Sequence, residues 1–278
     1  MSFYGKLANN RDISYLYRTI IVCPSMAKYC DLLLLFLLLA FPAFAQQELA
    51  CPRIQDGEII IRHTGHMLSY DTTALIPRWV AYELRDTDME GDAHRAAFFS
   101  PDPSPLLEGY PLAEHWHYSY SGWARGHMAP AGDFKYDQAA MDDTFYTTNV
   151  CPMDLTFNNS IWKRLEEKTR KLALEFGRVY ILTGPIMGTN KNGKVGESEI
   201  LIPDAFFKAL LVPRDSSYVA IGFLMPNEDP PTGYRLRDYA VTIRELESLT
   251  GMIFFDAMDE ITACKIKEIL PLKELGLF

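Results

Sequence analysis

Three runs of apolar residues in the second half of the chain constrain its fold more than any other feature. "RVYILTGPI", "FFKALLV" and "YVAIGFLM" follow one another between residues 178 and 225, and "NKNGK" supplies turn residues between the first two. Aromatic and β-branched residues are frequent in these runs, which is typical of β-strands. The chain shows no repeating strand–helix–strand rhythm. The sequence therefore predicts an α+β fold, with a largely antiparallel central sheet flanked by helices.

A long amphipathic helix is predicted just before these runs, over residues 158–176, "NNSIWKRLEEKTRKLALEF". Asn158 or Asn159 can cap its start, and Gly177 follows its last turn. Its apolar stripe consists of Ile161, Leu165, Leu172 and Phe176. Elsewhere we expect strands at Trp79–Leu84 and Phe145–Val150, a proline-rich loop at 100–111, and a final helix from about Leu236 to Leu249, closed by Gly251.

The N-terminal segment has the features of a secretory signal. Residues 31–44, "DLLLLFLLLAFPAF", follow Lys28, and Ala43 and Ala45 place small residues at the −3 and −1 positions of a cleavage site. We therefore expect residues 1–45 to be an N-terminal extension and signal peptide, with Met26 as an alternative start. Residues 46–278 would then form a single domain, secreted or periplasmic. An uncleaved membrane anchor is the alternative.

Composition and charge restrict the class of protein. Apolar residues make up 48% of the chain and charged residues 23%, as in ordinary globular proteins. Loss of residues 1–45 removes four basic and two acidic side chains, so the formal charge of −9 becomes −11. This acidic balance argues against a protein that coats polyanions in general. Any nucleic-acid site must therefore be locally basic.

The stretch "WARGHMAPAGDF", residues 123–134, places an arginine and a histidine two positions apart. On an extended strand Arg125 and His127 point to the same face. Histidine can take a proton from water near neutral pH, and arginine can bind phosphate oxygens in a bidentate manner. The pair suggests a phosphate contact beside a general base, although such a pair also arises by chance.

Polar residues also recur along the predicted helix. Asn158, Trp162, Glu166 and Arg170 are spaced by four and form one row beside the apolar stripe. Asn158 offers a carbonyl oxygen to a hard cation, Glu166 can hold the water shell that Mg²⁺ retains, and Arg170 can neutralise phosphate. The alternative is a capping asparagine with a surface Glu166–Arg170 ion pair.

Longer motifs resemble a known family. "RGHMAPAGDF", followed by "AMDDTFYTTNVCPMDLTFNNSIWKRLEE", is similar to the DNA/RNA non-specific endonucleases, the ββα-metal (His-Me finger) nucleases that include endonuclease G. The "VYILTGPI", "IPDAFFKALLV" and "GFLMPN" stretches resemble the same family. The likeness covers roughly residues 79–251 and implies a ββα-metal finger in a single nuclease domain, residues 46–278.

This resemblance assigns roles to individual residues. His127 would be the general base and Asn158 the one direct protein ligand of Mg²⁺, for which Mn²⁺ or another divalent cation can substitute. Glu166 would hold metal-bound water, and Asn149 would orient the site. The phosphate contacts would be Arg125, Arg170 and, by a looser match, Arg95 in "AHRAAFF".

The function implied is that of a secreted, sugar-non-specific endonuclease. It would hydrolyse DNA and RNA by reading the backbone, without a nucleotide cofactor or stable membrane association after cleavage, and a homodimer is possible. The alternatives are a catalytically weakened nucleic-acid-binding protein on the same fold and a narrower hydrolase of RNA or small phosphodiesters. Ala124 departs from the family, which commonly has aspartate there; we expect reduced or retuned activity at most.

Other titratable residues leave alternatives open. "EHWH" contains His115 and His117, which could bind zinc together with His127, but scattered surface histidines are the simpler interpretation. Cys51, Cys151 and Cys264 follow the signal, so one disulfide is possible with one thiol left over. Cys151 would brace the site if it is bonded, or make activity redox-sensitive if it is free.

Overall fold

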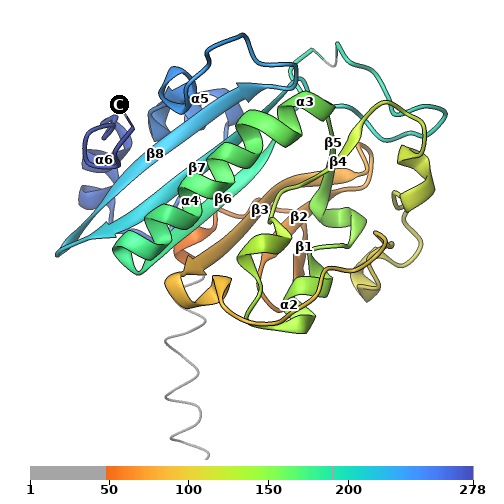
Figure 1. Ribbon diagram of the computed structural model, residues 1–278, viewed down its shortest axis with the longest axis horizontal. Helices are drawn as coiled ribbons and strands as arrows, with labels where there is room; N and C mark the ends of the chain where they lie inside the picture. Colours follow the sequence, from red (N-terminus) through yellow and green to blue (C-terminus); the bar gives the residue numbers. More distant parts are fainter. Residues whose placement is uncertain (1–47, 190, 278) are drawn as a thin grey trace, which may run out of the picture. The chain divides into compact units, whose positions relative to one another are not determined.

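An antiparallel sheet of seven strands forms the centre of the part of the chain that the computed structural model describes, residues 48–189 and 191–277 (Figure 1). The strand order is β1-β2-β3-β6-β7-β8-β9. The strands are β1 (Ile59–Arg62), β2 (Met67–Asp71), β3 (Ile76–Arg85), β6 (Arg178–Ile186), β7 (Ala205–Arg214), β8 (Ser217–Pro226) and β9 (Ala240–Val241). The prediction of an α+β fold around a largely antiparallel sheet is confirmed.

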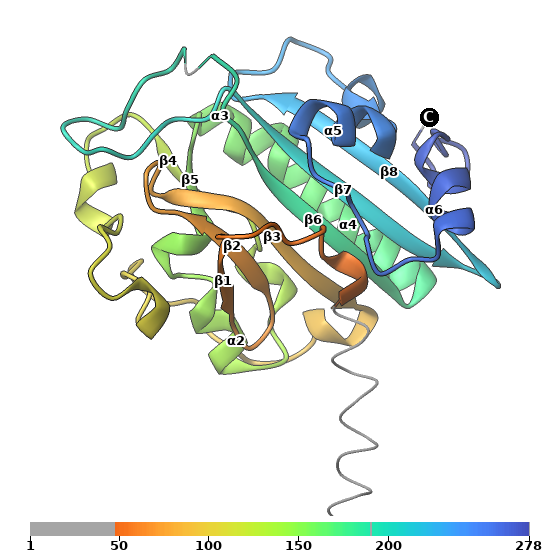
Figure 2. The same cartoon turned by 180° about the vertical axis from the view of Figure 1, so that it is seen from behind.

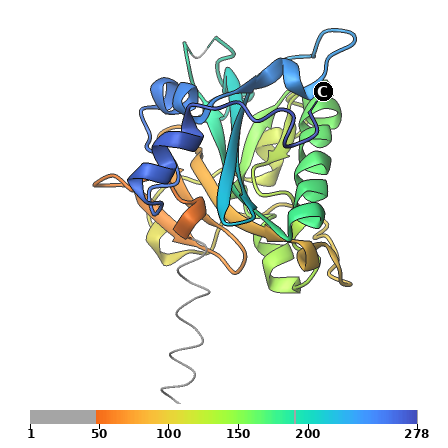
Figure 3. The same ribbon diagram turned by 90° about the vertical axis from the view of Figure 1, so that its left-hand side faces the viewer.

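Helices cover both faces of this sheet. α4 (Lys163–Phe176) lies on one face, and α5 (Ile243–Thr250) and α6 (Glu260–Lys267) lie on the other (Figures 2 and 3). Side chains alternate along each strand, so every central strand contributes to two cores. In β6, for example, Ile181 packs in the core beneath α4, whereas Leu182 packs in the core beneath α5 and α6.

Four of the predicted strands agree with the structure, and one is wrong. The apolar runs at 79–84, 178–186, 206–212 and 218–225 lie in β3, β6, β7 and β8. The strand expected at Phe145–Val150 does not form, because Thr147–Asn149 is a 3₁₀ turn and β5 begins only at Val150. In this turn the Asn149 amide bonds to the backbone of Ala129 and of Thr144.

The predicted 158–176 helix begins earlier than expected and is irregular. It consists of α3 (Leu155–Phe157), a π-helical turn, η7 (Asn158–Trp162), and α4. Asp154 is the N-cap, since its carboxylate accepts hydrogen bonds of 2.9 Å from the N–H groups of Thr156 and Phe157. Capping by Asn158 or Asn159 is therefore wrong. Gly177 ends the helix at φ +80°, as its sequence position suggests.

The C-terminal helix prediction is wrong in its extent. Leu236–Tyr239 is a 3₁₀ turn, β9 follows, and α5 begins only after Thr242, which forms a capping box with Glu245. Gly251 closes α5 as predicted, but α6 comes later and was not expected. The remaining helical segments are α2 (Gln138–Asp143) and the 3₁₀ turns Glu48–Ala50, Asp86–Met89, Pro105–Leu107, His115–Tyr118 and Ala131–Asp133.

The described residues all belong to one compact unit, residues 46–278. None of the helices formed by these residues is long and apolar enough to cross a membrane. The predicted signal peptide, its cleavage after Ala45 and the alternative start lie outside the described residues. The domain boundary therefore stays a prediction.

Candidate active site

A second, two-stranded sheet carries the arginine–histidine pair. β4 (Ala124–His127) runs antiparallel to β5 (Val150–Met153), with Arg125 opposite Pro152 and His127 opposite Val150. Arg125 and His127 therefore lie on one face, as predicted, while Gly126 lies on the other. A Cβ on Gly126 would collide with the Met153 side chain, which would have to move to admit any other residue there.

The helix that follows β5 is joined to this pair of strands. The indole N–H of Trp162, in the π-turn, donates to the His127 carbonyl over 3.3 Å. At the start of the helix, the side chain of buried Asn227 accepts from the Asp154 N–H at 2.8 Å and donates to the Pro152 carbonyl at 3.1 Å. The two strands and the helix thus form a ββα unit whose connection is fixed by hydrogen bonds.

His127 ends β4 in an aromatic environment. Its ring centroid lies 5.0 Å from that of Phe99 and 5.2 Å from that of Phe145. Nε2 is buried and has no hydrogen-bond partner among the described residues. Burial, reinforced by the charge of Arg95, lowers the pKa of His127 to about 3. The imidazole is therefore neutral at physiological pH, and its Nε2 makes no hydrogen bond to the described residues.

Two of the predicted phosphate contacts, Arg95 and Arg125, are held by different groups. The Arg95 guanidinium is exposed and lies 5.2 Å from the centroid of the Phe145 ring, which also contacts His127. Arg125 Nη2 donates to the His115 carbonyl over 2.6 Å, and the same guanidinium lies 5.5 Å from the Tyr118 ring. These contacts hold the Arg125 guanidinium in place, whereas the Arg95 guanidinium stays at the surface.

Asn149 is fully buried and bonded entirely to backbone. Its Oδ1 accepts from the Ala129 N–H at 2.9 Å, and its Nδ2 donates to the carbonyls of Ala129 and Thr144, each at 2.9 Å. The Asn149 carbonyl accepts from the Met128 N–H at 3.0 Å. The residue thereby holds the segment that follows His127, an arrangement in keeping with the orienting role implied by the resemblance.

Asn158 opens the π-turn and has an available amide. Its backbone N–H bonds to the Asp154 carbonyl at 2.9 Å, and the side chain, which is half-buried, makes no hydrogen bond within residues 48–189 and 191–277. The π-turn inserts extra backbone per turn, so Asn158 is rotated away from the regular row predicted with Trp162, Glu166 and Arg170. Only the last three keep α-helical spacing.

Arg170 pairs with a residue other than Glu166. Its Nη1 lies 2.7 Å from Oδ1 of buried Asp133, whose Oδ2 accepts from the Tyr82 hydroxyl at 2.9 Å. The surface Glu166–Arg170 ion pair considered above does not form. The Glu166 carboxylate makes no hydrogen bond in the described part of the chain, and burial raises its pKa to about 7, although Lys208 and Arg170 oppose that shift.

Lys208 is a site residue that sequence reasoning missed. It belongs to the row Phe206, Lys208, Leu210 on the face of β7 that packs beneath α4, and it is fully buried. Its Nζ lies 3.5 Å from the Met128 carbonyl and 4.7 Å from the centroid of the Trp162 ring. Burial lowers its pKa. A lysine within the apolar run "FFKALLV" was the available signal.

The zinc alternative is not supported. His115 and His117 lie on a 3₁₀ turn, not on a strand, and their Nδ1 atoms face the N–H groups of Phe99 and Glu114. No cluster of three or more histidine, cysteine, aspartate or glutamate side chains in the described residues could hold a metal ion. His63 instead bonds to Asp102 over 3.0 Å.

Cys151 is not linked to another cysteine of the described residues, so no disulfide of Cys151 braces the site there. Cys151 is a buried thiol opposite Gly126, and burial raises its pKa, so it is poorly disposed to form the reactive thiolate. Cys264 is an exposed thiol on α6. Cys51 is buried, and its pKa is raised to about 12.

Comparison with known proteins identifies the family. The sequence model described as "DNA/RNA non-specific endonuclease" matches residues 52–261. "Nuclease EXOG, mitochondrial" of Danio rerio is 38% identical over 212 residues, covering 71% of this chain and 61% of the relative. The human protein of that name is 35% identical over 213 residues, covering 71% and 57%. The chain thus spans about three fifths of the length of these curated relatives.

A solved structure agrees with this match. The chain described as "Crystal structure of the EndoG/EndoGI complex: Mechanism of EndoG inhibition" superimposes with a TM-score of 0.68 and 26% identity, covering 79% of this chain and 94% of that chain. The ββα unit described above and the antiparallel sheet behind it are thus a known arrangement. The chain belongs to the DNA/RNA non-specific endonuclease family.

Proposed function

We propose that this protein is an endonuclease that hydrolyses phosphodiester bonds of DNA and RNA without strong sequence preference. The observation that carries the proposal is the buried Nε2 of neutral His127, which has no hydrogen-bond partner in the described part of the chain, with Arg95 beside it and Arg125 on the same strand face. A neutral imidazole among guanidinium groups combines a proton acceptor with cations for phosphate oxygens. Membership of the family supports the same chemistry.

Each residue of the site has a distinct role in the proposed reaction. His127 takes a proton from the attacking water, while Arg95, Arg125 and Arg170 bind phosphate oxygens and stabilise their negative charge. Asn149 holds the backbone that follows His127. Because all of these groups contact the phosphate, the enzyme does not recognise individual bases and discriminates only weakly between the sugars of DNA and RNA.

The donor groups also fit a hard divalent cation. The Asn158 amide and the Glu166 carboxylate are both oxygen donors without hydrogen bonds among the described residues, and oxygen is the ligand that Mg²⁺ prefers. We propose that Asn158 would hold Mg²⁺ directly and that Glu166 would hold its water shell. When bound, the ion supplies Lewis-acid stabilisation of charge on the phosphate and the leaving oxygen.

We also propose export through the N-terminal apolar segment and leave the homodimer as a prediction. The apolar run at 31–44 supports export, whereas both relatives above are named mitochondrial. Cell fractionation with N-terminal sequencing distinguishes the two: a mature chain that begins at Gln46 in an exported fraction supports secretion. Recovery of the chain in mitochondria contradicts it.

The proposed activity is tested with supercoiled plasmid and single-stranded RNA. We expect nicking and RNA loss with Mg²⁺, none with EDTA, and a loss of about 10²–10⁴-fold in His127→Ala. His94→Ala removes an exposed histidine and should behave as wild type. Intact substrates with a folded wild-type protein contradict the proposal, and retained binding would then favour the nucleic-acid-binding alternative. Cleavage of RNA alone would favour the narrower hydrolase.

A further inference from the structure

A basic groove runs along the side of α4 that faces away from Glu166. It measures about 250 Å³ and lies between α4, the 3₁₀ turn Leu236–Tyr239 and the C-terminal segment. Its polar lining consists of Arg164, Lys168, Lys171, Arg235 and Arg237, with Glu167 as the single acid. We call it the α4 groove. This excess of cations is unusual in a chain with a formal charge of −9.

The cations contributed by the helix have no carboxylate partner. Arg164, Lys168 and Lys171 form no ion pair within the described ranges; Arg164 instead lies 4.9 Å from the Tyr234 ring. Burial lowers the pKa of Lys168, and the neighbouring Lys171 adds to that shift, although Glu175 opposes it. On the opposite wall, Asp238 pairs with both Arg235, at 3.5 Å, and Arg237, at 4.0 Å. An anion in the groove would relieve the repulsion between the Lys168 and Lys171 charges.

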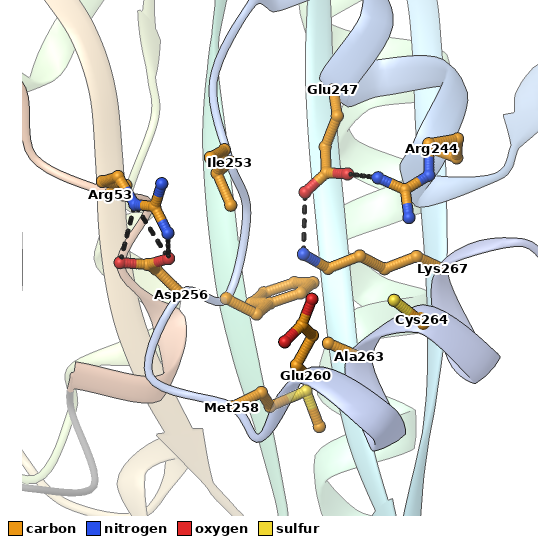
Figure 4. A pocket seen from close by; sticks show the side chains of 11 residues that line it. Arg53, Arg244, Glu247, Ile253, Asp256, Met258, Glu260, Ala263, Cys264 and Lys267 are labelled. Atoms are coloured by element: carbon orange, nitrogen blue, oxygen red, sulfur yellow. Dashed lines mark hydrogen bonds and ion pairs between the residues drawn. The ribbon is translucent and has the colours of Figure 1, made fainter.

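A second pocket shows that such unpaired charge is not general in this protein. It lies between α5, α6 and the 253–258 segment, and Figure 4 shows each of its cations already bonded to a carboxylate. Arg53 pairs with Asp256 at 2.9 Å, while Arg244 and Lys267 both pair with Glu247 at 2.8 Å. The charges there cancel, so that pocket has no net attraction for an anion.

Helix geometry connects the α4 groove to the candidate active site. Arg164, Lys168 and Lys171 are spaced by four and three and so share one flank, whereas Glu166 lies about 160–200° around the helix from Arg164 and Lys168. Exposed Lys163 lies on the ridge between the two flanks. A helix is about 10–12 Å wide with its side chains, so about three nucleotides of a strand cross it.

We propose that the α4 groove is a second phosphate-binding site, which holds the substrate backbone away from the scissile bond. This inference rests on the proposed nuclease function. A strand that leaves the candidate active site crosses the ridge at Lys163 and places its phosphates against the cations of the α4 groove, Lys168 and Lys171 among them. A nucleic acid fits better than a lipid surface, because the cations line a concave groove that a strand can enter and a flat bilayer surface cannot.

The test compares the wild-type full chain with Lys168→Gln/Lys171→Gln on a dinucleotide and on a 30-nucleotide single strand. We expect kcat/KM on the long strand to fall about tenfold at low salt, and the slope of its logarithm against log salt to become shallower by about one to one and a half. The dinucleotide, whose single phosphate is the scissile one, cannot reach the groove and should be cleaved equally by both. Lys265→Gln removes an exposed lysine on α6 and should match wild type.

Binding in EDTA separates this inference from the proposed function. In the His127→Ala background, the charge variant should bind the labelled 30-mer more weakly, with the same reduced salt slope. Equal salt slopes in the presence and absence of the two lysines overturn the inference, even where wild type cleaves normally. Loss of binding to phosphatidylserine vesicles with unchanged DNA binding also overturns it. An inactive wild type that still shows the binding difference contradicts only the proposed function.

Discussion

Replacement of Lys208 by methionine is expected to stabilise the protein while impairing catalysis. Lys208 is fully buried beneath α4, and no carboxylate in the described residues forms an ion pair with it. Its ammonium has one long hydrogen bond of 3.5 Å, to Met128, and lies 4.7 Å from the Trp162 ring. Methionine has a similar length and no charge, so Lys208→Met removes the charge with little change in volume.

The expected change in stability follows from these contacts. Desolvation of a buried ammonium costs several kcal/mol, whereas a desolvated cation–π contact contributes about 2 kcal/mol and a hydrogen bond this long less than about 1 kcal/mol. Attraction to Glu166 and Asp133 offsets part of the remainder. We therefore expect the free energy of unfolding to rise by about 1–2 kcal/mol, and Tm by about 2–8 °C for a domain of this size.

Catalysis should change in the opposite direction. Among the charged groups near Glu166, Lys208 lowers its pKa most strongly, although burial still raises that pKa to about 7. Without it, the acid limb of the pH–rate profile should move to higher pH by about one unit, and kcat at pH 7 should fall. Lys208→Arg should keep the limb in place. Leu210→Met, on the same face of β7, controls for repacking.

The assay combines thermal unfolding with pH–rate profiles on one nucleic-acid substrate. A raised Tm together with a shifted acid limb supports the reasoning. A Tm that falls by more than a few degrees would mean that the Lys208 contacts outweigh its desolvation. An unmoved acid limb would mean that Lys208 and Glu166 are not coupled.

The remaining predictions concern the carboxylate, a glycine and the thiols. Activity of wild type should fall as pH decreases through about 7, where Glu166 becomes protonated, and Glu166→Gln should abolish this acid limb. Because folding raises the pKa of Glu166 from 4.5, the stability that Glu166 contributes is full below pH 4.5 and is lost as pH rises through about 7. Thermal melting of Glu166→Gln as a function of pH should lack this loss. Gly126→Ala should lower the free energy of unfolding by about 1–3 kcal/mol, since the new methyl meets Met153, and Met153→Ala should recover part of it in denaturant titrations. A thiol reagent should modify Cys264 rapidly in the native protein and Cys151 only on unfolding; rapid native modification of Cys151, measured by mass spectrometry, would revive its redox role.

Local patterns determined much of this fold from the sequence alone. The runs that became β6, β7 and β8 carry strand periodicity in adjacent residues, and Gly177 and Gly251 supply left-handed ends to α4 and α5. The same is true of the Arg125 and His127 pair, because two-residue spacing on a strand fixes a common face. Such features depend on neighbours within a few positions, which a sequence displays directly.

Only the tertiary structure decided the partners of the site residues. Arg170 could have paired with Glu166 four positions away, but it pairs with Asp133 from a segment 37 positions away. Lys208 and Met128 meet across 80 positions, and Asn227 bonds to Asp154 across 73. The sequence contains these residues, but burial and long-range packing determine which of them meet, and these in turn set the charge at Glu166 and His127.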